Sequence, residues 1–227
     1  IEEALTNLDL VPRTLWVSSL ANCDIQESLR KIFIKEEIQA VITTTSFNSN
    51  INKSDQSNQT FWDDLKIPIF QLISSTNSKQ KWLESSLGLS PVDLSLQVVM
   101  PELDGRIITR PCSFKTIKKA DGKLNTAIHF NSPNKETIDW SVRLIKNWIK
   151  LKITPNKEKK ICLTISNYPN RDGRLANGVG LDTPESLINI LRWLKMEGYY
   201  LGIDEIPSTS KQLMEMLLSK RTNNPET

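Results

Sequence analysis

Apolar and β-branched residues recur in short runs along the chain, separated by polar stretches. An apolar run of four to eight residues is typical of a buried strand, whereas apolar residues spaced three and four apart indicate a helix. The two patterns alternate, and this alternation predicts a mostly parallel sheet covered by helices. The segments with strand character are 15–17, 38–45, 67–73, 106–114, 127–130, 161–165 and 199–203.

The clearest helical pattern lies at 135–151, where Ile138, Val142 and Ile145 share one face. Further helices are expected after Asp24, at 78–87, after Asp182 or Thr183, and at 210–219. The predicted fold class is therefore α/β, with three layers and mostly parallel sheets flanked by helices. Two Rossmann-like or flavodoxin-like units fit this pattern. We expect a first α/β unit at 1–134, a connecting helix and linker at 135–156, and a second α/β unit at 157–227.

Composition narrows the class of protein. A chain of 227 residues can form one α/β unit or two small ones, and its net charge of +3 gives no strong case for nucleic acid or an acidic membrane as a partner. No apolar run approaches the roughly 18 to 20 residues that span a bilayer. Cys23, Cys112 and Cys162 are odd in number and far apart, which indicates free thiols in a reducing compartment and hence a cytoplasmic protein. Cys162 is expected in a buried strand.

A long polar loop follows the apolar run 161–165 and precedes an expected helix. In open α/β sheets, ligands usually bind beyond the carboxyl end of a strand. Gly173, Gly178 and Gly180 allow the backbone of this loop to approach a ligand closely. A long exposed connection that needs glycine to turn would have a similar composition. The candidate binding residues in the loop are Arg171, Asp172, Arg174 and Asn177.

A second candidate site combines acids with an arginine. On extended backbone, Glu102, Asp104 and Arg106 would point to the same side. We expect Glu102 and Asp104 as catalytic groups that take protons or guide a metal, and Arg106 as a substrate-binding group. A structural salt bridge beside Gly105 is the alternative. The metal-binding residues are unknown, because the single histidine, His129, is better explained as a structural residue.

Three segments carry a family resemblance. Residues 167–184 have the sequence Asn-Tyr-Pro-Asn-Arg-Asp-Gly-Arg-Leu-Ala-Asn-Gly-Val-Gly-Leu-Asp-Thr-Pro, residues 99–108 Val-Met-Pro-Glu-Leu-Asp-Gly-Arg-Ile-Ile, and residues 82–91 Trp-Leu-Glu-Ser-Ser-Leu-Gly-Leu-Ser-Pro. Their sequences and order resemble the CobN-like large subunits of aerobic cobaltochelatase, which group with the large subunits of magnesium chelatase. The resemblance covers roughly residues 60 to 205, and the Arg-Asp-Gly-Arg loop favours the cobalt branch.

The resemblance implies a function as well as a fold. It implies ATP-dependent insertion of Co2+ into a corrin precursor of cobalamin, with a tetrapyrrole as substrate. AAA+ ATPase and metal-binding partner subunits would use the ATP, and this chain, which has no Gly-x-x-x-x-Gly-Lys-[Ser/Thr] loop, would not bind it. The chain would then be a piece of a much longer subunit, with its second α/β unit incomplete and no activity in isolation.

Two alternatives stay open. The first is the large H subunit of magnesium chelatase, which would insert Mg2+ into protoporphyrin IX. The second is a non-catalytic α/β ligand-binding or scaffold domain, in which the glycine-rich loop recognises a carboxylated small molecule.

Overall fold

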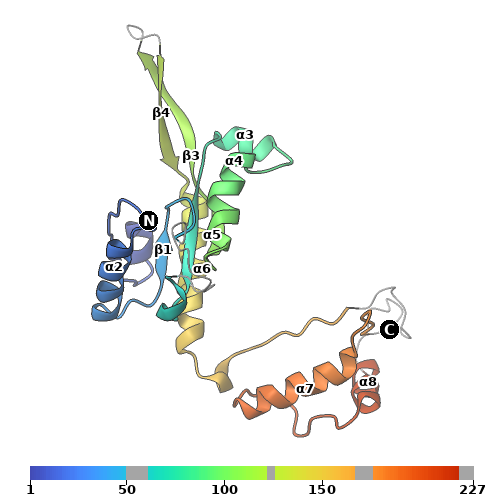
Figure 1. The fold of residues 1–227 in the computed structure, drawn as a ribbon. Coiled ribbons are helices and arrows are strands. Elements are labelled where there is room, and N and C mark those ends of the chain that lie inside the picture. Colours follow the sequence, from blue (N-terminus) through green and yellow to red (C-terminus); the bar gives the residue numbers. More distant parts are fainter. Residues whose placement is uncertain (50–60, 122–125, 167–175, 220–227) are drawn as a thin grey trace. The chain divides into compact units, whose positions relative to one another are not determined.

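The computed structural model describes residues 1–49, 61–121, 126–166 and 176–219 (Figure 1). The chain divides into two compact units, Ile1–Lys152 and Ile153–Thr227. The first unit contains α1 (Glu2–Thr6), α2 (Cys23–Lys35), β1 (Val41–Thr43), η1 (Asp63–Leu65), β2 (Ile69–Ser75), α3 (Lys79–Glu84), α4 (Pro91–Leu94), η2 (Ser95–Val99), α5 (Met100–Glu102), β3 (Ile107–Asp121), β4 (Thr126–Pro133) and α6 (Lys135–Ile153). The second contains η3 (Asn156–Glu158), α7 (Thr183–Met196) and α8 (Ser210–Leu218).

The sheet of the first unit confirms the predicted α/β class. Its four strands lie in the order β1-β2-β3-β4, with β1, β2 and β3 parallel and β4 antiparallel to β3. Pro111 does not interrupt β3, but the register with β2 shifts on both sides of its pairing with Ile73. Pairing with β2 ends at Phe114, and from there β3 and β4 continue as a two-stranded arm (Figure 1).

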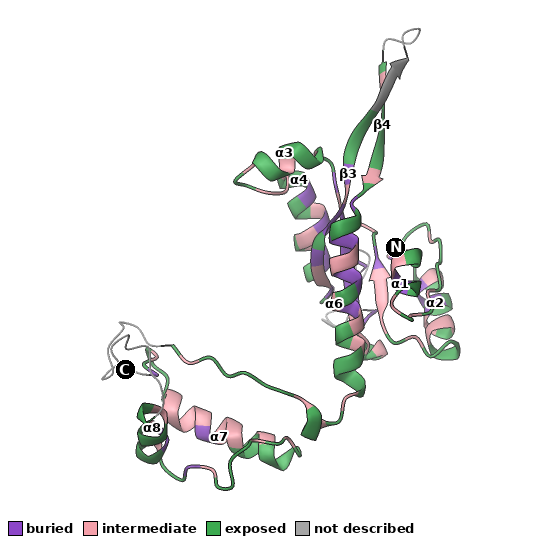
Figure 2. Ribbon diagram, turned by 180° about the vertical axis from the view of Figure 1, so that it is seen from behind, coloured by how far each residue is buried: buried purple, intermediate pink, exposed green. Residues whose placement is uncertain are grey.

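Two clusters of buried side chains form the core of this unit. One joins Leu72 of β2 to Ile138 and Val142 of α6, together with Leu5 and Cys112. The other joins Leu29 of α2 to Ile69 of β2, with Leu20, Phe61 and Trp62. Figure 2 shows buried residues along α6, so this helix covers the sheet of the first unit. The segment 135–156 was expected to connect two units, but its helix contributes core residues to the first.

Several expected strands do not form. The segments 15–17, 161–165 and 199–203 contain no strand, and in the described part of the second unit the only β pairing is an isolated bridge between Gly178 and Leu181. A strand forms only when a neighbouring strand takes its backbone hydrogen bonds, and apolar content does not supply that neighbour. Cys162 is accordingly exposed, and the prediction of a buried strand residue is wrong.

The ends of the helices follow from local chemistry. Asn22, and not Asp24, caps α2, because its side chain accepts hydrogen bonds from the N–H groups of Asp24 and Ile25.

No helix in the described ranges is long and apolar enough to cross a membrane.

Candidate functional site

A buried ion pair lies at the start of β3. Arg106 Nη2 donates to Asp104 Oδ2 at 2.6 Å, and both side chains are fully buried. The guanidinium also donates to the carbonyl oxygens of Thr45 and Phe47 and to Gln71 Oε1, at 2.9–3.1 Å. Arg106 therefore ties the loop that follows β1 to the strands β2 and β3.

The carboxylate of Asp104 is bound from several directions. Its Oδ2 accepts from Ser49 N at 2.8 Å and from Trp62 Nε1 at 3.4 Å, and the guanidinium of Arg106 lies 5.7 Å from the Trp62 ring centre. Burial lowers the pKa of Arg106, and the Asp104 carboxylate opposes that shift. Three buried polar atoms here have no partner: Ser49 Oγ, Asp104 Oδ1 and Arg106 Nε. Such a network stabilises the fold only while both charges remain paired.

Glu102 does not lie beside this pair as expected. It is the last residue of α5 and is exposed, whereas Asp104 is only 2% exposed. The backbone between them is a turn, with Gly105 at a φ of +71°. The prediction that extended backbone places Glu102, Asp104 and Arg106 on one side is therefore wrong. The alternative of a structural salt bridge beside Gly105 describes Asp104 and Arg106.

A second buried acid, Asp93, was missed in the sequence. Its carboxylate accepts hydrogen bonds from Thr76 N and Thr76 Oγ1 at 2.9 and 3.0 Å, and from Gln97 Nε2 at 3.2 Å. Gln97 in turn bonds both backbone groups of Ser74 at 2.7 Å. Asp93 and Gln97 are four residues apart, a spacing that places two polar side chains on one helix face and could have indicated their shared role.

These contacts attach α4 and η2 to the carboxyl end of β2. The π-helical turn of η2 is a rare form that often accompanies functional sites. The hydroxyl groups of Ser74 and Ser113 lie 2.7 Å apart beside it. Polar groups therefore gather at the carboxyl end of β2, and ligands of α/β proteins usually bind beyond the carboxyl ends of the strands.

The glycine-rich loop belongs to the second unit. Arg171, Asp172 and Arg174 lie outside the described residues. Asn177 is exposed, and its carbonyl oxygen accepts a hydrogen bond from Ser166 Oγ at 3.2 Å. Asn177 thus belongs to the second unit, whereas Asp104 belongs to the first.

A tight turn leads from this loop into α7. A Cβ atom on Gly178 would lie 2.9 Å from Thr183 Oγ1, so the backbone approaches the helix closely there. Asp182 Oδ1 accepts from Glu185 N at 3.0 Å and caps α7. The start of α7 is therefore capped by its own chain.

The described residues hold no cluster of three or more His, Cys, Asp or Glu side chains that could bind a metal. His129 is exposed on β4, opposite Ile117 of β3. Trp16 and Trp193 are exposed, at 96% and 63%, whereas Trp62 is buried beside the ion pair. The exposed tryptophans are the flat apolar surfaces that a planar ligand could use.

Comparison with known proteins places these features in a family. The model of the CobN/Magnesium Chelatase family matches residues 1–227. The chain belongs to this family. It is 34% identical over 224 residues to the aerobic cobaltochelatase subunit CobN of Pseudomonas aeruginosa, a match that covers 99% of this chain and 18% of that protein.

Two further chelatase subunits are similar to this chain. The catalytic subunit of cobaltochelatase from Mycobacterium tuberculosis has a similar structure, with a TM-score of 0.76 and 27% identity over 96% of this chain and 18% of its own. The H subunit of magnesium chelatase from Chlorobaculum parvum is 34% identical over 138 residues, which cover 61% of this chain and 10% of that protein. The chain thus spans 18% of the length of these two cobaltochelatase relatives.

Proposed function

We propose that this chain is part of the tetrapyrrole-binding large subunit of a cobaltochelatase, which inserts Co2+ into a corrin precursor of cobalamin. The observation that carries the proposal is the extent of the match, because 99% of the chain aligns with a cobaltochelatase subunit and 61% with a magnesium-chelatase subunit. The structural similarity to a cobaltochelatase catalytic subunit supports the same branch.

The proposal assigns substrate binding to the glycine-rich loop and catalysis to the candidate site at 102–106. Arg171, Asp172, Arg174 and Asn177 bind the peripheral carboxylates and amides of the corrin. A guanidinium matches the geometry of a carboxylate, which makes arginine suited to this role. The loop that carries these residues follows the apolar segment 161–165 and precedes α7.

Glu102 is the acid that we propose for catalysis. It is exposed, so it can take a pyrrole proton or guide the metal. Asp104 and Arg106 help to position Glu102, because their buried network holds the turn that follows α5. In this geometry Asp104 and Arg106 are positioning residues, and contact with substrate would require the ion pair to open.

Partner subunits supply the rest of the reaction in this proposal. AAA+ subunits hydrolyse ATP and assist metal delivery, and Co2+ is a substrate of the complex. We place the assembly in the cytoplasm, which the three free cysteines support.

The test uses the full-length subunit that contains this chain. Absorbance titration with a cobyrinate derivative and with protoporphyrin IX measures which tetrapyrrole binds. Insertion of Co2+ and of Mg2+ is then followed with the partner subunits and ATP present. We expect corrin binding and Co2+ insertion. Protoporphyrin binding with Mg2+ insertion would assign the chain to the magnesium branch, and absence of binding to either would leave a scaffold or another ligand.

The variant Glu102→Gln tests the catalytic proposal in the same assay. It should lower the insertion rate and leave corrin affinity nearly unchanged, because it removes a group that acts in the transition state. Glu136→Gln is the matched control, since Glu136 is an exposed acid of α6 that lies outside the candidate site. Equal insertion rates in the two variants would exclude Glu102 as a catalytic residue.

A further inference from the structure

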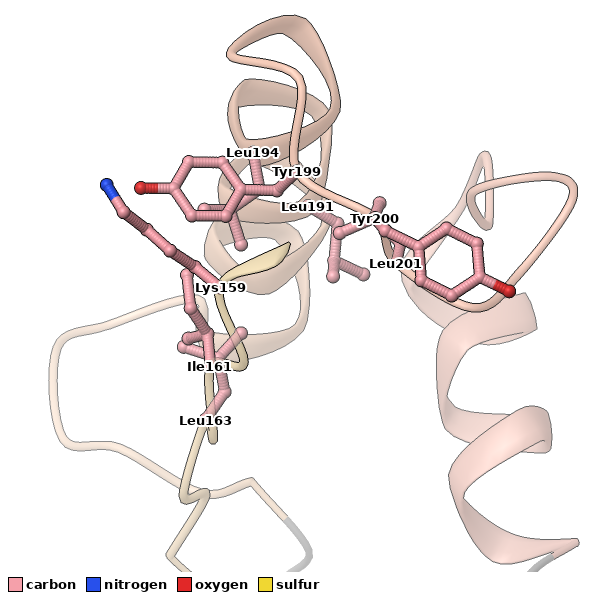
Figure 3. Close-up of a pocket in the computed structure, with 8 residues that line it drawn as sticks. All are labelled: Lys159, Ile161, Leu163, Leu191, Leu194, Tyr199, Tyr200 and Leu201. Atoms are coloured by element: carbon pink, nitrogen blue, oxygen red, sulfur yellow. The ribbon is translucent and has the colours of Figure 1, made fainter. Parts of the chain in front are cut away.

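An open hollow of about 130 Å³ lies within the second unit (Figure 3). Ile161 and Leu163 line it from the segment before the glycine-rich loop, and Leu191 and Leu194 line it from α7. The segment after α7 completes the lining, and the rings of Tyr199 and Tyr200 point in opposite directions. Two segments that were expected as strands therefore flank the hollow.

The lining has the period of a β-strand. Lys159, Ile161 and Leu163 are alternate residues, so they share one side of an extended segment. Ile161 and Leu163 remain 51% and 42% exposed, respectively. In the described residues, no backbone–backbone hydrogen bond joins 160–165 to another segment. The segment has the side-chain pattern of a buried strand, together with an open backbone and an exposed apolar face.

The polar groups of the hollow do not converge on a small ligand. Lys159 Nζ donates to Asn156 Oδ1 at 2.9 Å and lies 5.8 Å from the centre of the Tyr199 ring. The other lining residues from 161–163 and from α7 are aliphatic. Small-molecule pockets are normally larger, about 300–1,000 Å³, and place several polar groups to fix orientation, whereas an apolar strand needs only aliphatic contacts and free backbone groups.

We propose that the open edge of 160–165, together with this hollow, is a docking slot for an apolar β-strand from the part of the large subunit that lies outside these 227 residues. The relatives supply the length required, because the matched region is 18% of the Pseudomonas aeruginosa subunit. The incoming strand pairs with the backbone of 160–165, and its apolar side chains on the same face cover Ile161 and Leu163 and enter the hollow beside Leu191. The strand that the sequence predicts at 161–165 then forms in the complete subunit.

Hydrogen exchange measured by mass spectrometry tests the proposal without metal or tetrapyrrole. In the 227-residue chain the amides of 160–165 should exchange quickly, and in the full-length subunit they should exchange at least about a hundredfold more slowly, as ladder amides do. Equally fast exchange in both would overturn the proposal. So would protection in both chains that arises from direct pairing of 160–165 with 199–203.

A variant pair localises the effect. Leu163→Asp places a charge in the slot and should restore fast exchange at 160–165 in the full-length subunit. Met196→Asp is the control: Met196 lies on α7, is 81% exposed and does not line the hollow, so its variant should keep the protection. Protection that survives Leu163→Asp would contradict a strand in the slot.

Light scattering on the 227-residue chain tests whether a second copy of the chain occupies the slot. A dimer that protects 160–165 would show that a second copy fills the slot and would overturn the proposal. The inference depends on the family and not on the proposed substrate, so failure of corrin binding would leave it standing.

Discussion

The first unit and the second unit differ in how far they bury their side chains. In Ile1–Lys152, α6 and α2 supply core residues to two clusters that include strands of the sheet, and even charged groups such as Asp104 and Arg106 are enclosed and paired. In the described part of Ile153–Thr227, only Ala176, Ile188, Pro207 and Leu213 are buried.

The difference shows where the information for each fold resides. Strands β1, β2 and β3 pair with one another, so the first unit completes its own hydrogen bonds. The second unit carries segments of equal apolar character, but its described residues supply no strand to pair with them. We infer that stability is concentrated in the first unit.

The largest effect should come from the enclosed ion pair. Arg106→Ala leaves the Asp104 carboxylate buried without its partner and should lower the free energy of unfolding by about 3–5 kcal/mol. Urea unfolding of the 227-residue chain, followed by tryptophan fluorescence, measures the change. Lys31→Ala is the control, because Lys31 is 76% exposed where it pairs with Glu27 and should cost less than about 0.5 kcal/mol. Equal costs would mean that the network contributes no more than a surface pair.

Variants in the second unit should instead change binding. Replacing Arg171 and Arg174 with alanine in the full-length subunit removes two charge-assisted contacts and should weaken corrin binding by about 3 kcal/mol, a factor on the order of a hundred. The unfolding midpoint should not move. The control is Arg13→Ala, because Arg13 is an exposed arginine of the first unit. Unchanged affinity in the double variant would contradict the role of the loop.

The sequence predicted the main elements of the first unit, apart from a strand at 15–17 that does not form, because their signals are local. Apolar spacing located α6, and β-branched runs located β1 and β2. The turn at 102–106 was expected only as the alternative, because alternation alone cannot show that Pro101 lies in a helix and that Gly105 takes a positive φ. The segments 161–165 and 199–203 were misassigned because strand formation depends on neighbours that a sequence window does not contain.

Some candidate site residues could be predicted from the sequence, and others could not. The acids at 102 and 104 could be named from their chemistry, but burial separates them into an exposed Glu102 and an enclosed Asp104. Asp93 and Gln97 escaped notice because a polar residue inside a helical pattern is usually solvated, and here both bond the end of β2.

A pair of identical substitutions compares the packing of the two units directly. Ile145→Val removes a methylene group from a side chain that is 1% exposed and should cost about 0.5–1.5 kcal/mol. Ile161→Val makes the same change at a side chain that is 51% exposed and should cost less than about 0.5 kcal/mol. Urea unfolding of both variants of the 227-residue chain measures the difference. A large cost for Ile161→Val would show that the slot is already closed.

The smallest expected effect concerns the three cysteines, of which Cys23 and Cys112 lie in the first unit and Cys162 in the second. Cys23 and Cys162 are exposed and should react with a thiol reagent in the native chain, whereas Cys112 should react only after unfolding. Burial raises the pKa of Cys112, whose thiol donates to the Ile73 carbonyl oxygen at 3.1 Å. The protonated thiol is therefore favoured in the folded state. Its contribution to stability is complete below the pKa of the unfolded thiol and is lost as the pH rises through the folded pKa.

The pH dependence can be isolated with Cys112→Ala, in which the unfolding free energy should fall less between about pH 7 and pH 10 than in the parent chain. Cys162→Ala is the control, because Cys162 is exposed and its removal should leave the pH dependence of the parent chain intact. Rapid labelling of Cys112 in the native chain would contradict the enclosed core of the first unit. Slow labelling of Cys162 would contradict the open second unit, and a change in that rate in the full-length subunit would report that the segment 160–165 has been covered.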